Sequence, residues 1–480
     1  MFTFLLIVFD LILVGLLTNF FLECVREKEP RAPKAAAALL IVGIMLVPVI
    51  LWVPPGRAVV AVVFAALAVA GLALFIPARV DRRILSGAGG HVVQPVNRVD
   101  ERDIVFARLR LGPENLPYYR KYYDSRPELE AADAQRRQKG LLGTLGRIDN
   151  AYQPNTAMVH ASFDLPNILG PHAKADPVQA EDRMNMDPAR ATNLVKNYAR
   201  HLGADMVGIC RVNPLWVYSN RGEIHYGNWE EWGKQLDDIL PYAVVLLTEM
   251  GWDHVSSAPH TPSVAESAHD YGKGAYLSTL LARWFAHMGY RGVAQNTRNY
   301  DTLLVPLAVD AGLGEMGRHG YLIAPKYGAR VRIFATLTDM PLVPDKPVSL
   351  GVEEFCRKCK KCAESCPSKS IPLHGKSIIN GSERWKLNED SCFEYWAKVG
   401  TDCSICMAVC PYSRPDTFSH KIVRGLLTRS WGARAFFPVV DNYLYGKLWK
   451  PRQVAPWLDF NPSDKREQED SPFNDLHATE

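Results

Sequence analysis

Three long runs of apolar residues open the chain, and shorter runs interrupted by polar residues follow them. The three runs cover Phe2–Leu22, Ala35–Val53 and Ala58–Ile76. Each is about long enough to cross the roughly 30 Å hydrocarbon core of a bilayer as a helix. The first run lacks the basic start and small-residue cleavage site of a signal peptide, so the pattern predicts three membrane-spanning helices. Asp10 interrupts the first run, and its carboxylate either reaches the nearby interface or has a function within the membrane.

Basic residues are unevenly distributed between the loops that flank these runs. The loop after the first run and the segment after the third are basic, whereas the loop after the second holds only Arg57. Basic loops stay on the cytoplasmic side, so we expect a multi-pass protein of the cytoplasmic (inner) membrane, in contact with lipid. Its N-terminus would lie outside and its remaining chain in the cytoplasm. The two basic groups are Arg26, Lys28, Arg31 and Lys34, and Arg79, Arg82 and Arg83.

Beyond the apolar runs, the periodicity changes between helix and strand. Asn193–Leu202 carries a helical stripe of apolar residues, and Val264–Tyr290 predicts a long helix, broken or kinked near Gly272 and Gly274. The segment 91–140 is polar and gives no clear element. Buried strands are predicted at Asp205–Val212, Ala243–Met250 and Arg330–Met340.

This order of elements predicts a mixed α+β or α/β fold in several units. We expect three transmembrane helices in residues 1–80, a linker and the N-terminal part of the soluble region in 81–185, and an α/β core in 186–345. A Cys-rich unit would occupy 346–425, and a C-terminal tail packing on the core would occupy 426–480.

Charge and cysteine content narrow the classes of partner and metal. The net charge is only +4 and no long Lys/Arg run occurs, which argues against a nucleic-acid partner. Of the 10 cysteines, Cys24 and Cys210 stand alone and are expected to be packing residues. The others lie between Cys356 and Cys410, which favours metal ligation over a disulfide framework.

The cysteine spacing indicates iron–sulfur clusters. "FCRKCKKCAESCP" (355–367) has the spacing C-x2-C-x2-C-x3-C-P, and "CSICMAVCP" (403–411) repeats part of it, with Cys392 upstream. In two-cluster ferredoxins the last cysteine of each run ligates the other cluster, whereas zinc sites favour paired C-x2-C knuckles. The second run departs from a plain ferredoxin because its first cysteine lies further upstream. We expect one [4Fe–4S] cluster on Cys356, Cys359, Cys362 and Cys410, and a second on Cys366, Cys392, Cys403 and Cys406.

Two such clusters conduct electrons and therefore need an electron acceptor. No G-x-G-x-x-G follows a predicted strand, so the sequence offers no flavin or nicotinamide fingerprint. The acceptor should be another cofactor or the substrate itself.

The order of motifs resembles that of the reductive dehalogenases, over roughly residues 95–460. The similar stretches are Asp103–Asp133, Asn197–Val212 and Pro306–Leu342, which contains "AGLGEMGRHG" and "GARVRIFATLTDMPL", together with the two Cys motifs. The resemblance implies an oxidoreductase that replaces a carbon–halogen bond of an organohalide with carbon–hydrogen. It also implies a base-off cobalamin between a nitroreductase-like α/β core and a ferredoxin-like unit; the sequence has no D-x-H-x-x-G segment to supply a His ligand.

The fused apolar runs depart from the pattern of the family. Many members carry a twin-arginine leader and are anchored by a separate small protein. The compartment and the electron donor of those members therefore cannot be assumed for this chain. The donor could be a quinol or a reduced ferredoxin- or flavodoxin-type protein.

The resemblance also implies site residues. Tyr271 falls at the position of the family's catalytic tyrosine, with Tyr276 as an alternative, and Gly272 and Gly274 would allow a flat macrocycle to approach. A cation beside a tyrosine makes its phenol a better acid for protonating carbon. That cation is expected to be Arg332, with Arg330 and Lys326 as alternatives; Asn299 would contact substrate or corrin, and Gly312 and Gly314 would shape a turn near the cofactor.

Two other functions remain open at this stage. Epoxyqueuosine reductase shares cobalamin and two clusters but acts on tRNA, which fits poorly with membrane helices and a chain without a basic tract. A membrane electron-transfer subunit would carry the two clusters without a corrinoid, so cobalt analysis would distinguish it.

Overall fold

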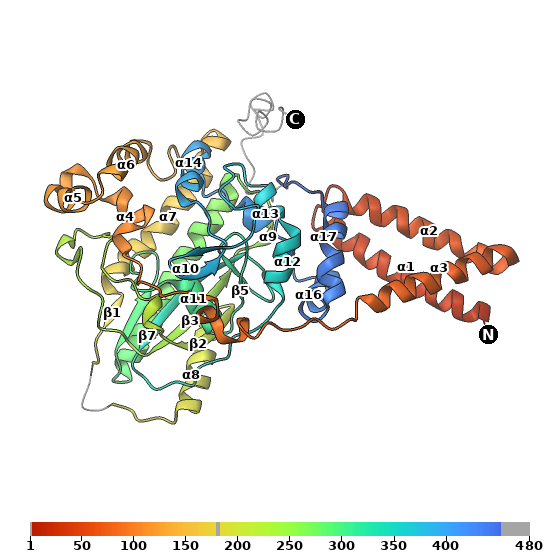
Figure 1. Cartoon of the computed structure of the whole chain (residues 1–480), viewed down its shortest axis with the longest axis horizontal. Coiled ribbons are helices and arrows are strands. Elements are labelled where there is room, and N and C mark those ends of the chain that lie inside the picture. The colour runs from red at the N-terminus through yellow and green to blue at the C-terminus, as the bar shows by residue number, and fades with distance from the viewer. Residues whose placement is uncertain (1, 179–182, 453–480) are drawn as a thin grey trace.

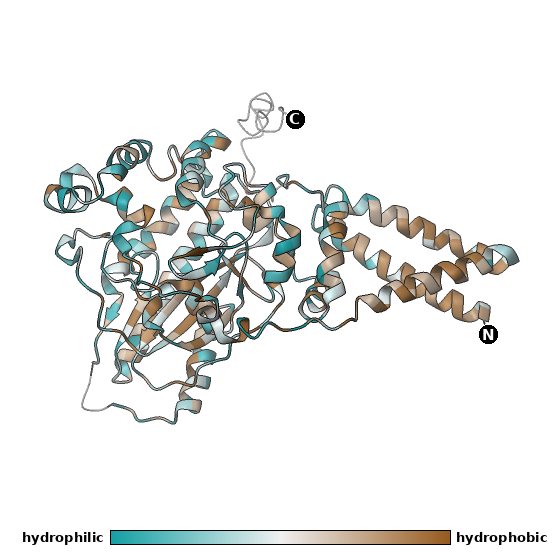
Figure 2. Cartoon of the chain, viewed as in Figure 1, coloured by the Kyte–Doolittle hydropathy of each residue, from teal (hydrophilic) through white to brown (hydrophobic). Residues whose placement is uncertain are grey.

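The computed structural model describes residues 2–178 and 183–452, and Figure 1 shows a bundle of three helices projecting from a mixed α/β body. The bundle consists of α1 (Phe2–Arg26), α2 (Ala32–Trp52) and α3 (Pro54–Ala73). Each is long and apolar enough to span a membrane, and Figure 2 shows the bundle as predominantly hydrophobic. The prediction of three long apolar helices is confirmed.

The body is built on one five-stranded sheet. Its strand order is β1 (Lys174–Ala175), β4 (Gly292–Gln295), β7 (Val331–Thr338), β3 (Tyr242–Glu249) and β2 (Met206–Arg211). All neighbouring strands are antiparallel. The mixed fold class is therefore confirmed, and the alternation of helices and strands does not produce a parallel sheet.

The central helix of the body is α10 (Thr261–His287), which packs against α7 (Gln153–Leu169) and β7. It runs unbroken through both of its central glycines, so the expected break or kink was wrong. A Cβ on Gly272 would lie 3.1 Å from the Ser162 carbonyl oxygen of α7, and one on Gly274 would lie 2.2 Å from the Phe334 ring of β7. The glycines thus allow close packing within the protein, and the expectation that they leave room for a macrocycle was also wrong.

The polar segment after the anchor forms small helices around buried polar groups. These are α4 (Val105–Arg110), α5 (Leu116–Tyr123) and α6 (Pro127–Lys139). The Tyr123 hydroxyl donates to Asp133 at 3.1 Å, and Arg108 lies 3.7 Å from the same carboxylate. Because the core of this segment is a network of tyrosines and ion pairs, its hydrophobic pattern is weak.

The Cys-rich unit extends from α12 (Val352–Cys359), on the side of the body that faces the anchor, to α14 (Glu389–Val399), near α6 and α7 (Figure 1). It also contains α13 (Lys361–Glu364) and α15 (Ile405–Ala408), and is followed by α16 (Phe418–Arg429) and α17 (Trp431–Tyr445). Residues 453–480 of the expected C-terminal tail lie outside the described residues.

The remaining elements are short connections or cover the sheet. They are α8 (Pro188–His201), α9 (Trp252–Val255), α11 (Leu304–Asp310), β5 (Glu315–Met316), β6 (Leu322–Ile323), β8 (Ser377–Ile379) and β9 (Ser382–Arg384). Short 3-10 helices occur at Ile84–His91, Glu101–Asp103, Pro113–Asn115, Arg147–Asp149, Gly170–His172, Pro214–Trp216, Trp229–Glu231 and Pro411–Ser413.

The two lone cysteines are buried in separate hydrophobic clusters. Cys24 packs with Ala32 and Tyr445, and Cys210 of β2 lies in a cluster that includes its strand neighbour Ala243 of β3. Both positions suit packing residues.

Candidate functional site

The structure brings Tyr271 of α10 and Arg332 of β7 together, although 61 positions separate them in the chain. Arg332 Nη1 donates to the Tyr271 hydroxyl oxygen at 3.1 Å, and the guanidinium carbon lies 4.8 Å from the ring centroid. Phe163 and Phe334 contact the same tyrosine ring, at centroid distances of 5.6 and 6.3 Å. These contacts fix both the ring and its hydroxyl oxygen.

A carboxylate from the Cys-rich unit holds Arg332. Its Nη2 donates to Asp402 Oδ2 at 2.7 Å and to Ser267 Oγ at 2.5 Å, and Ser267 Oγ in turn donates to Asp402. Burial alone would lower the pKa of Arg332, but the Tyr271 phenol, Asp402 and Asp270 outweigh burial and raise it. Arg332 therefore stays a cation beside the phenol, in a position set by two units of the fold.

The alternative side chains have their contacts elsewhere in the described part of the chain. Tyr276 points outward from α10 and is 43% exposed. Arg330 is fully buried, where it donates to the Ser413 carbonyl oxygen and pairs with Glu249 at 3.0 Å. Lys326 is half exposed and donates to Tyr327 at 3.0 Å. Of these candidates, Tyr271 and Arg332 are the two that the structure joins.

Asn299 and the two turn glycines have structural contacts. Asn299 Nδ2 donates to the Ala294 carbonyl oxygen at 2.8 Å, and its Oδ1 accepts from Arg221 at 3.3 Å. Gly312 has φ +72° directly after α11, and a Cβ on Gly314 would lie 2.2 Å from the Ile323 carbonyl oxygen. The glycines do form a tight turn, while contact of any of these residues with a cofactor stays a prediction.

The hairpin β5–β6 adds two residues that the sequence analysis did not select. Burial raises the pKa of Tyr321 well above its usual value, with further contributions from the thiols of Cys406 and Cys392; Arg332 and Tyr271 also affect it electrostatically. Tyr321 thus lies close enough to both the second cysteine group and the Tyr271–Arg332 pair to interact with them electrostatically.

The second residue of this hairpin is His319. Its Nδ1 accepts the Tyr321 backbone N–H at 3.1 Å, and burial lowers its pKa to about 4. Among the buried atoms without a hydrogen-bond partner are His319 Nε2, Arg332 Nε and Asp270 Oδ2. Buried polar atoms normally have partners, so this region suits a ligand that carries polar groups of its own.

One sequence signal could have identified part of this site. Asp402 directly precedes Cys403 in "TDCSIC", His319 lies within the quoted stretch "AGLGEMGRHG", and Tyr321 directly follows that stretch. An acidic residue beside a predicted cluster ligand was a candidate partner for the predicted arginine.

The electrostatic influences among the eight clustered thiols largely follow the two predicted ligand sets. Burial, with a smaller contribution from the neighbouring thiol of Cys410, raises the pKa of Cys356 to about 12. Burial likewise raises the pKa of Cys410 to about 12, with a smaller contribution from Cys359. Burial and then Cys366 raise the pKa of Cys392 to about 12. Burial also raises the pKa of Cys403 and Cys406, and each of these thiols is influenced by Cys366 and Cys392. Cys362 of the first set also acts on Cys406, and the assignment of each cysteine to a cluster stays a prediction.

These thiols suit iron–sulfur clusters. All eight are free cysteines, and no three His, Cys, Asp or Glu side chains in the described part of the chain converge as ligands of a single metal ion. A cubane cluster instead distributes its four cysteines over four iron corners. Buried thiols are costly to ionise, and cluster iron offsets the charge of the thiolate ligands.

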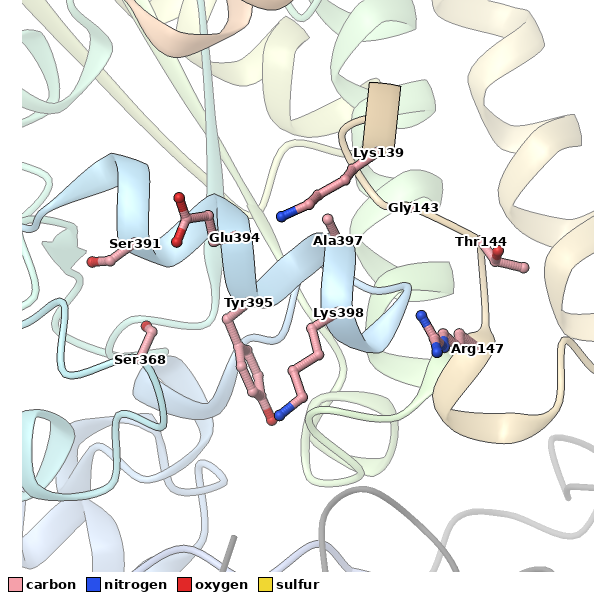
Figure 3. Close-up of a pocket in the computed structure, with 10 residues that line it drawn as sticks. All are labelled: Lys139, Gly143, Thr144, Arg147, Ser368, Ser391, Glu394, Tyr395, Ala397 and Lys398. Atoms are coloured by element: carbon pink, nitrogen blue, oxygen red, sulfur yellow. The ribbon is translucent and has the colours of Figure 1, made fainter. Parts of the chain in front are cut away.

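A cavity of about 650 Å³ lies beside the second cysteine group (Figure 3). Two residues of its lining approach this group. The Ser368 hydroxyl oxygen lies 3.5 Å from the Cys366 sulfur, and Cys403 contributes, after burial, to the raised pKa of Tyr395. Lys139 and Arg147 also line it, whereas Tyr271 and Arg332 do not. The cavity adjoins the electron-transfer side of the site. Its lining is Lys139, Gly143, Thr144, Arg147, Ser368, Ser391, Glu394, Tyr395, Ala397 and Lys398.

Comparison with known proteins agrees with this geometry. Residues 355–413 match the model of the 4Fe-4S dicluster domain. The chain is 35% identical to the tetrachloroethene reductive dehalogenase of Sulfurospirillum multivorans over 277 residues, covering 50% of this chain and 54% of the relative. The trichloroethene reductive dehalogenase of Dehalococcoides mccartyi is 27% identical, over 47% of this chain and 41% of the relative.

Structural comparison gives the same result over more of the chain. The catabolic reductive dehalogenase NpRdhA, solved in complex with 3-bromo-4-hydroxybenzoic acid, superposes with a TM-score of 0.59 and 25% identity, covering 77% of this chain and 52% of NpRdhA. An epoxyqueuosine reductase of Cellulophaga algicola is 26% identical over 46% of this chain and is a more distant relative. The chain spans about half the length of the first curated relatives that it matches. It is a homologue of the reductive dehalogenases that carries a 4Fe-4S domain and three apolar N-terminal helices.

Proposed function

We propose that this protein is a membrane-anchored reductive dehalogenase that replaces a carbon–halogen bond with carbon–hydrogen. The observation that carries the proposal is the hydrogen bond from Arg332 to the Tyr271 hydroxyl oxygen, beside the second cysteine group. The reaction consumes two electrons and one proton, and it releases one halide ion for each substrate molecule. A fixed phenol next to a cation and an electron-transfer unit supplies both requirements.

Tyr271 would donate the proton from its hydroxyl group to the substrate carbon. Arg332 stabilises the phenolate that remains, because its guanidinium already contacts the phenol oxygen. Asp402 and Ser267 are positioning residues, since they bind Arg332.

The cofactors would be two [4Fe–4S] clusters and a base-off cobalamin. Residues 346–425 would hold the clusters on the two cysteine sets, and residues 186–345 would bind the corrinoid near His319, Tyr271 and Arg332. When bound, cobalamin supplies the cobalt centre that receives electrons and acts on the carbon–halogen bond. The fit rests on the unpartnered buried polar atoms at this position.

The base-off state can be tested separately. If a histidine bound cobalt, His319 would be the candidate, because it is buried and contacts Tyr321 beside the Tyr271–Arg332 pair. We expect the EPR spectrum of the Co(II) state to lack nitrogen hyperfine splitting and to be unchanged in His319→Ala. Splitting that disappears in His319→Ala would show a histidine ligand to cobalt, and splitting that persists in this variant would contradict the base-off state.

The partners of this reaction would be an organohalide, membrane lipid and an electron donor, either a quinol or a reduced ferredoxin- or flavodoxin-type protein. The basic loops support an outside N-terminus and a body in the cytoplasm. A C-terminal reporter fusion should therefore be active in the cytoplasm, and activity confined to the outer side would contradict this orientation.

Halide release is the direct test of the activity. The purified full chain, loaded with its cofactors, would be supplied with reduced methyl viologen and a panel of chlorinated alkenes and halogenated phenols without oxygen. We expect stoichiometric halide release from at least one class, strongly reduced in Tyr271→Phe and retained in Tyr276→Phe. A fully loaded protein that releases halide from neither class would contradict the proposal.

A further inference from the structure

The helix α17 exposes apolar side chains on the side that faces away from the body. Phe436, Val439 and Tyr443 recur at helical spacing, and Val439 and Tyr443 are 67% and 68% exposed. Its opposite side is buried, with Arg434 paired to Glu354 of α12 at 2.8 Å. An ordinary surface helix would turn polar residues outward, so this face suits an apolar environment.

The neighbouring helix α16 extends this apolar surface. Phe418 and Ile422 are exposed on α16, and Trp431 is exposed where α17 begins. We call the exposed side chains of the two helices the apolar platform. It comprises Phe418, Ile422, Trp431, Phe436, Val439 and Tyr443.

The apolar platform is continuous with the membrane anchor. The Trp431 backbone N–H donates to the Ile76 carbonyl oxygen at 3.1 Å, and the Ala78 N–H donates to Arg429 at 2.8 Å. On the other side, Glu23 at the end of α1 accepts from the Phe418 N–H at 2.9 Å. Figure 1 shows α16 and α17 lying across the base of the three apolar helices. The platform therefore begins at the level where the anchor helices end.

The charges around this junction are separated by sign. The acidic residues of the loop between α1 and α2 are buried, with Glu27 bound to His420 at 3.1 Å and Glu29 bound to Arg452 at 2.8 Å. The exposed charged side chains at this level include the basic residues Arg26, Arg31, Lys34, Arg79, Arg429 and Lys450. A basic rim around an apolar face is typical of proteins that bind anionic bilayers.

We propose that the apolar platform lies on the surface of an anionic bilayer, with Phe436, Val439 and Tyr443 in the boundary between headgroups and acyl chains. We assign lipid as the occupant because the platform is continuous with the three apolar helices of the anchor and is surrounded by positive charge. This proposal does not depend on the dehalogenase activity.

The platform determines which cysteine group lies nearest the bilayer. Asp441 of α17 forms a buried ion pair with Lys361, which lies in the chain between Cys359 and Cys362. The carboxylate of Asp441 also acts electrostatically on Cys359 and Cys410. The group of Cys356, Cys359, Cys362 and Cys410 would therefore lie above the bilayer surface, and a lipid-borne electron donor would meet it before the second group.

Photo-crosslinking of the full chain in lipid nanodiscs tests this placement. The photoreactive residue p-benzoylphenylalanine would replace Val439 or Tyr443. Ile378 of β8, which is also apolar, 50% exposed and distant in sequence from the platform, would be replaced as the control. In phosphatidylglycerol nanodiscs we expect a lipid adduct by mass spectrometry at both platform positions and none at residue 378. The absence of lipid adducts at both platform positions would overturn the proposal.

Two further measurements test the choice of occupant. The adduct yield at residue 439 should be at least about twofold higher with phosphatidylglycerol than with phosphatidylcholine, and this ratio should fall in high salt, which screens surface charge. Equal yields would overturn the assignment to anionic lipid. In native membranes the same probe should again capture lipid, and capture of a protein instead would show that the platform is a protein interface.

Discussion

Two arginines, Arg332 mostly buried and Arg414 fully buried, lie on opposite sides of the Cys-rich unit, and each contacts a tyrosine ring and a carboxylate. Arg332 binds Tyr271 and Asp402 on the side of the sheet. Arg414 lies 3.9 Å from the centroid of the Tyr445 ring and binds Glu29 at 2.5 Å on the side of the anchor. The same residue types therefore build two sites in one chain.

The two sites differ in how the arginine meets the tyrosine and in what holds the arginine. Arg332 also donates to the phenol oxygen of Tyr271, so its charge acts where a proton would leave. Burial raises the pKa of Tyr445 well above its usual value, although Arg414 acts in the opposite direction. We infer that the first site is built for proton transfer and that the second fastens the body to the anchor.

The largest expected difference comes from removing one phenol oxygen from each site. Tyr271→Phe keeps the ring but deletes the acid, and general acid catalysis typically contributes about 10²–10⁴-fold. Turnover with reduced methyl viologen should fall by about that factor, while clusters and corrinoid still load. Tyr445→Phe should change this turnover little. Equal losses in the two variants would remove the distinction between the sites.

Glu29→Gln tests the anchor site through stability. Arg414 and Arg452 both bind this carboxylate, so the amide leaves two buried cations without a counter-charge. Breaking a buried ion pair typically costs about 3–5 kcal/mol. We expect a clearly lower thermal midpoint for the loaded protein in detergent.

The matched control for that variant is Glu383→Gln, because Glu383 pairs with Arg83 on the surface at 3.4 Å with 40% exposure. An exposed pair contributes little, so its midpoint should hardly move. Similar midpoints for Glu29→Gln and Glu383→Gln would show that the junction does not depend on the buried carboxylate.

Arg332 variants test whether charge or geometry matters at the first site. Arg332→Met removes a charged hydrogen bond worth about 1.5–3 kcal/mol, which corresponds to roughly 10–10²-fold in turnover. Arg332→Lys should lose less, because a positive charge remains near the phenol although the planar fork is lost. Steady-state turnover with loaded protein checks this order, and a lysine variant as slow as the methionine variant would favour geometry over charge.

The smallest expected effect concerns the pH dependence of stability near Tyr271. Burial and then Glu266 raise the pKa of Asp270 from 3.8 to about 8, although Arg332 and Lys273 act in the opposite direction. The folded protein therefore keeps a proton that the unfolded chain has released, so stability falls as pH rises from about 4 to about 8. Asp270→Asn should remove this contribution.

The thermal midpoint of Asp270→Asn should exceed that of the parent by a few degrees at pH 8 and by less at pH 6. The variant should still lose some stability over this range, because burial also raises the pKa of Glu101 to about 8. A constant difference between the two proteins across this range would contradict the assignment to Asp270.

The sequence predicted features that depend on local pattern. Hydropathy predicted the three apolar helices, periodicity predicted β2, β3 and β7 to within about two residues at each end, and cysteine spacing predicted the 4Fe-4S domain. In each case the signal lies within a short stretch of chain. The expected domain boundaries have not been tested and stay predictions.

Features that depend on long-range packing could not be predicted in this way. The break expected in α10 was wrong because α7 and Phe334 fill the space beside its two glycines, which the sequence of α10 cannot show. Arg330 and Arg332 share a strand pattern, and only their distant partners, Glu249 and Asp402, separate a structural arginine from a site arginine.

The metal content of the purified full chain tests the central claim most directly. The protein, produced with a corrinoid supply and kept free of oxygen, would be analysed for cobalt and iron per chain. We predict about one cobalt and about eight irons, the content of one cobalamin and two four-iron clusters. About eight irons without cobalt would contradict the account and would identify an iron–sulfur electron-transfer subunit instead.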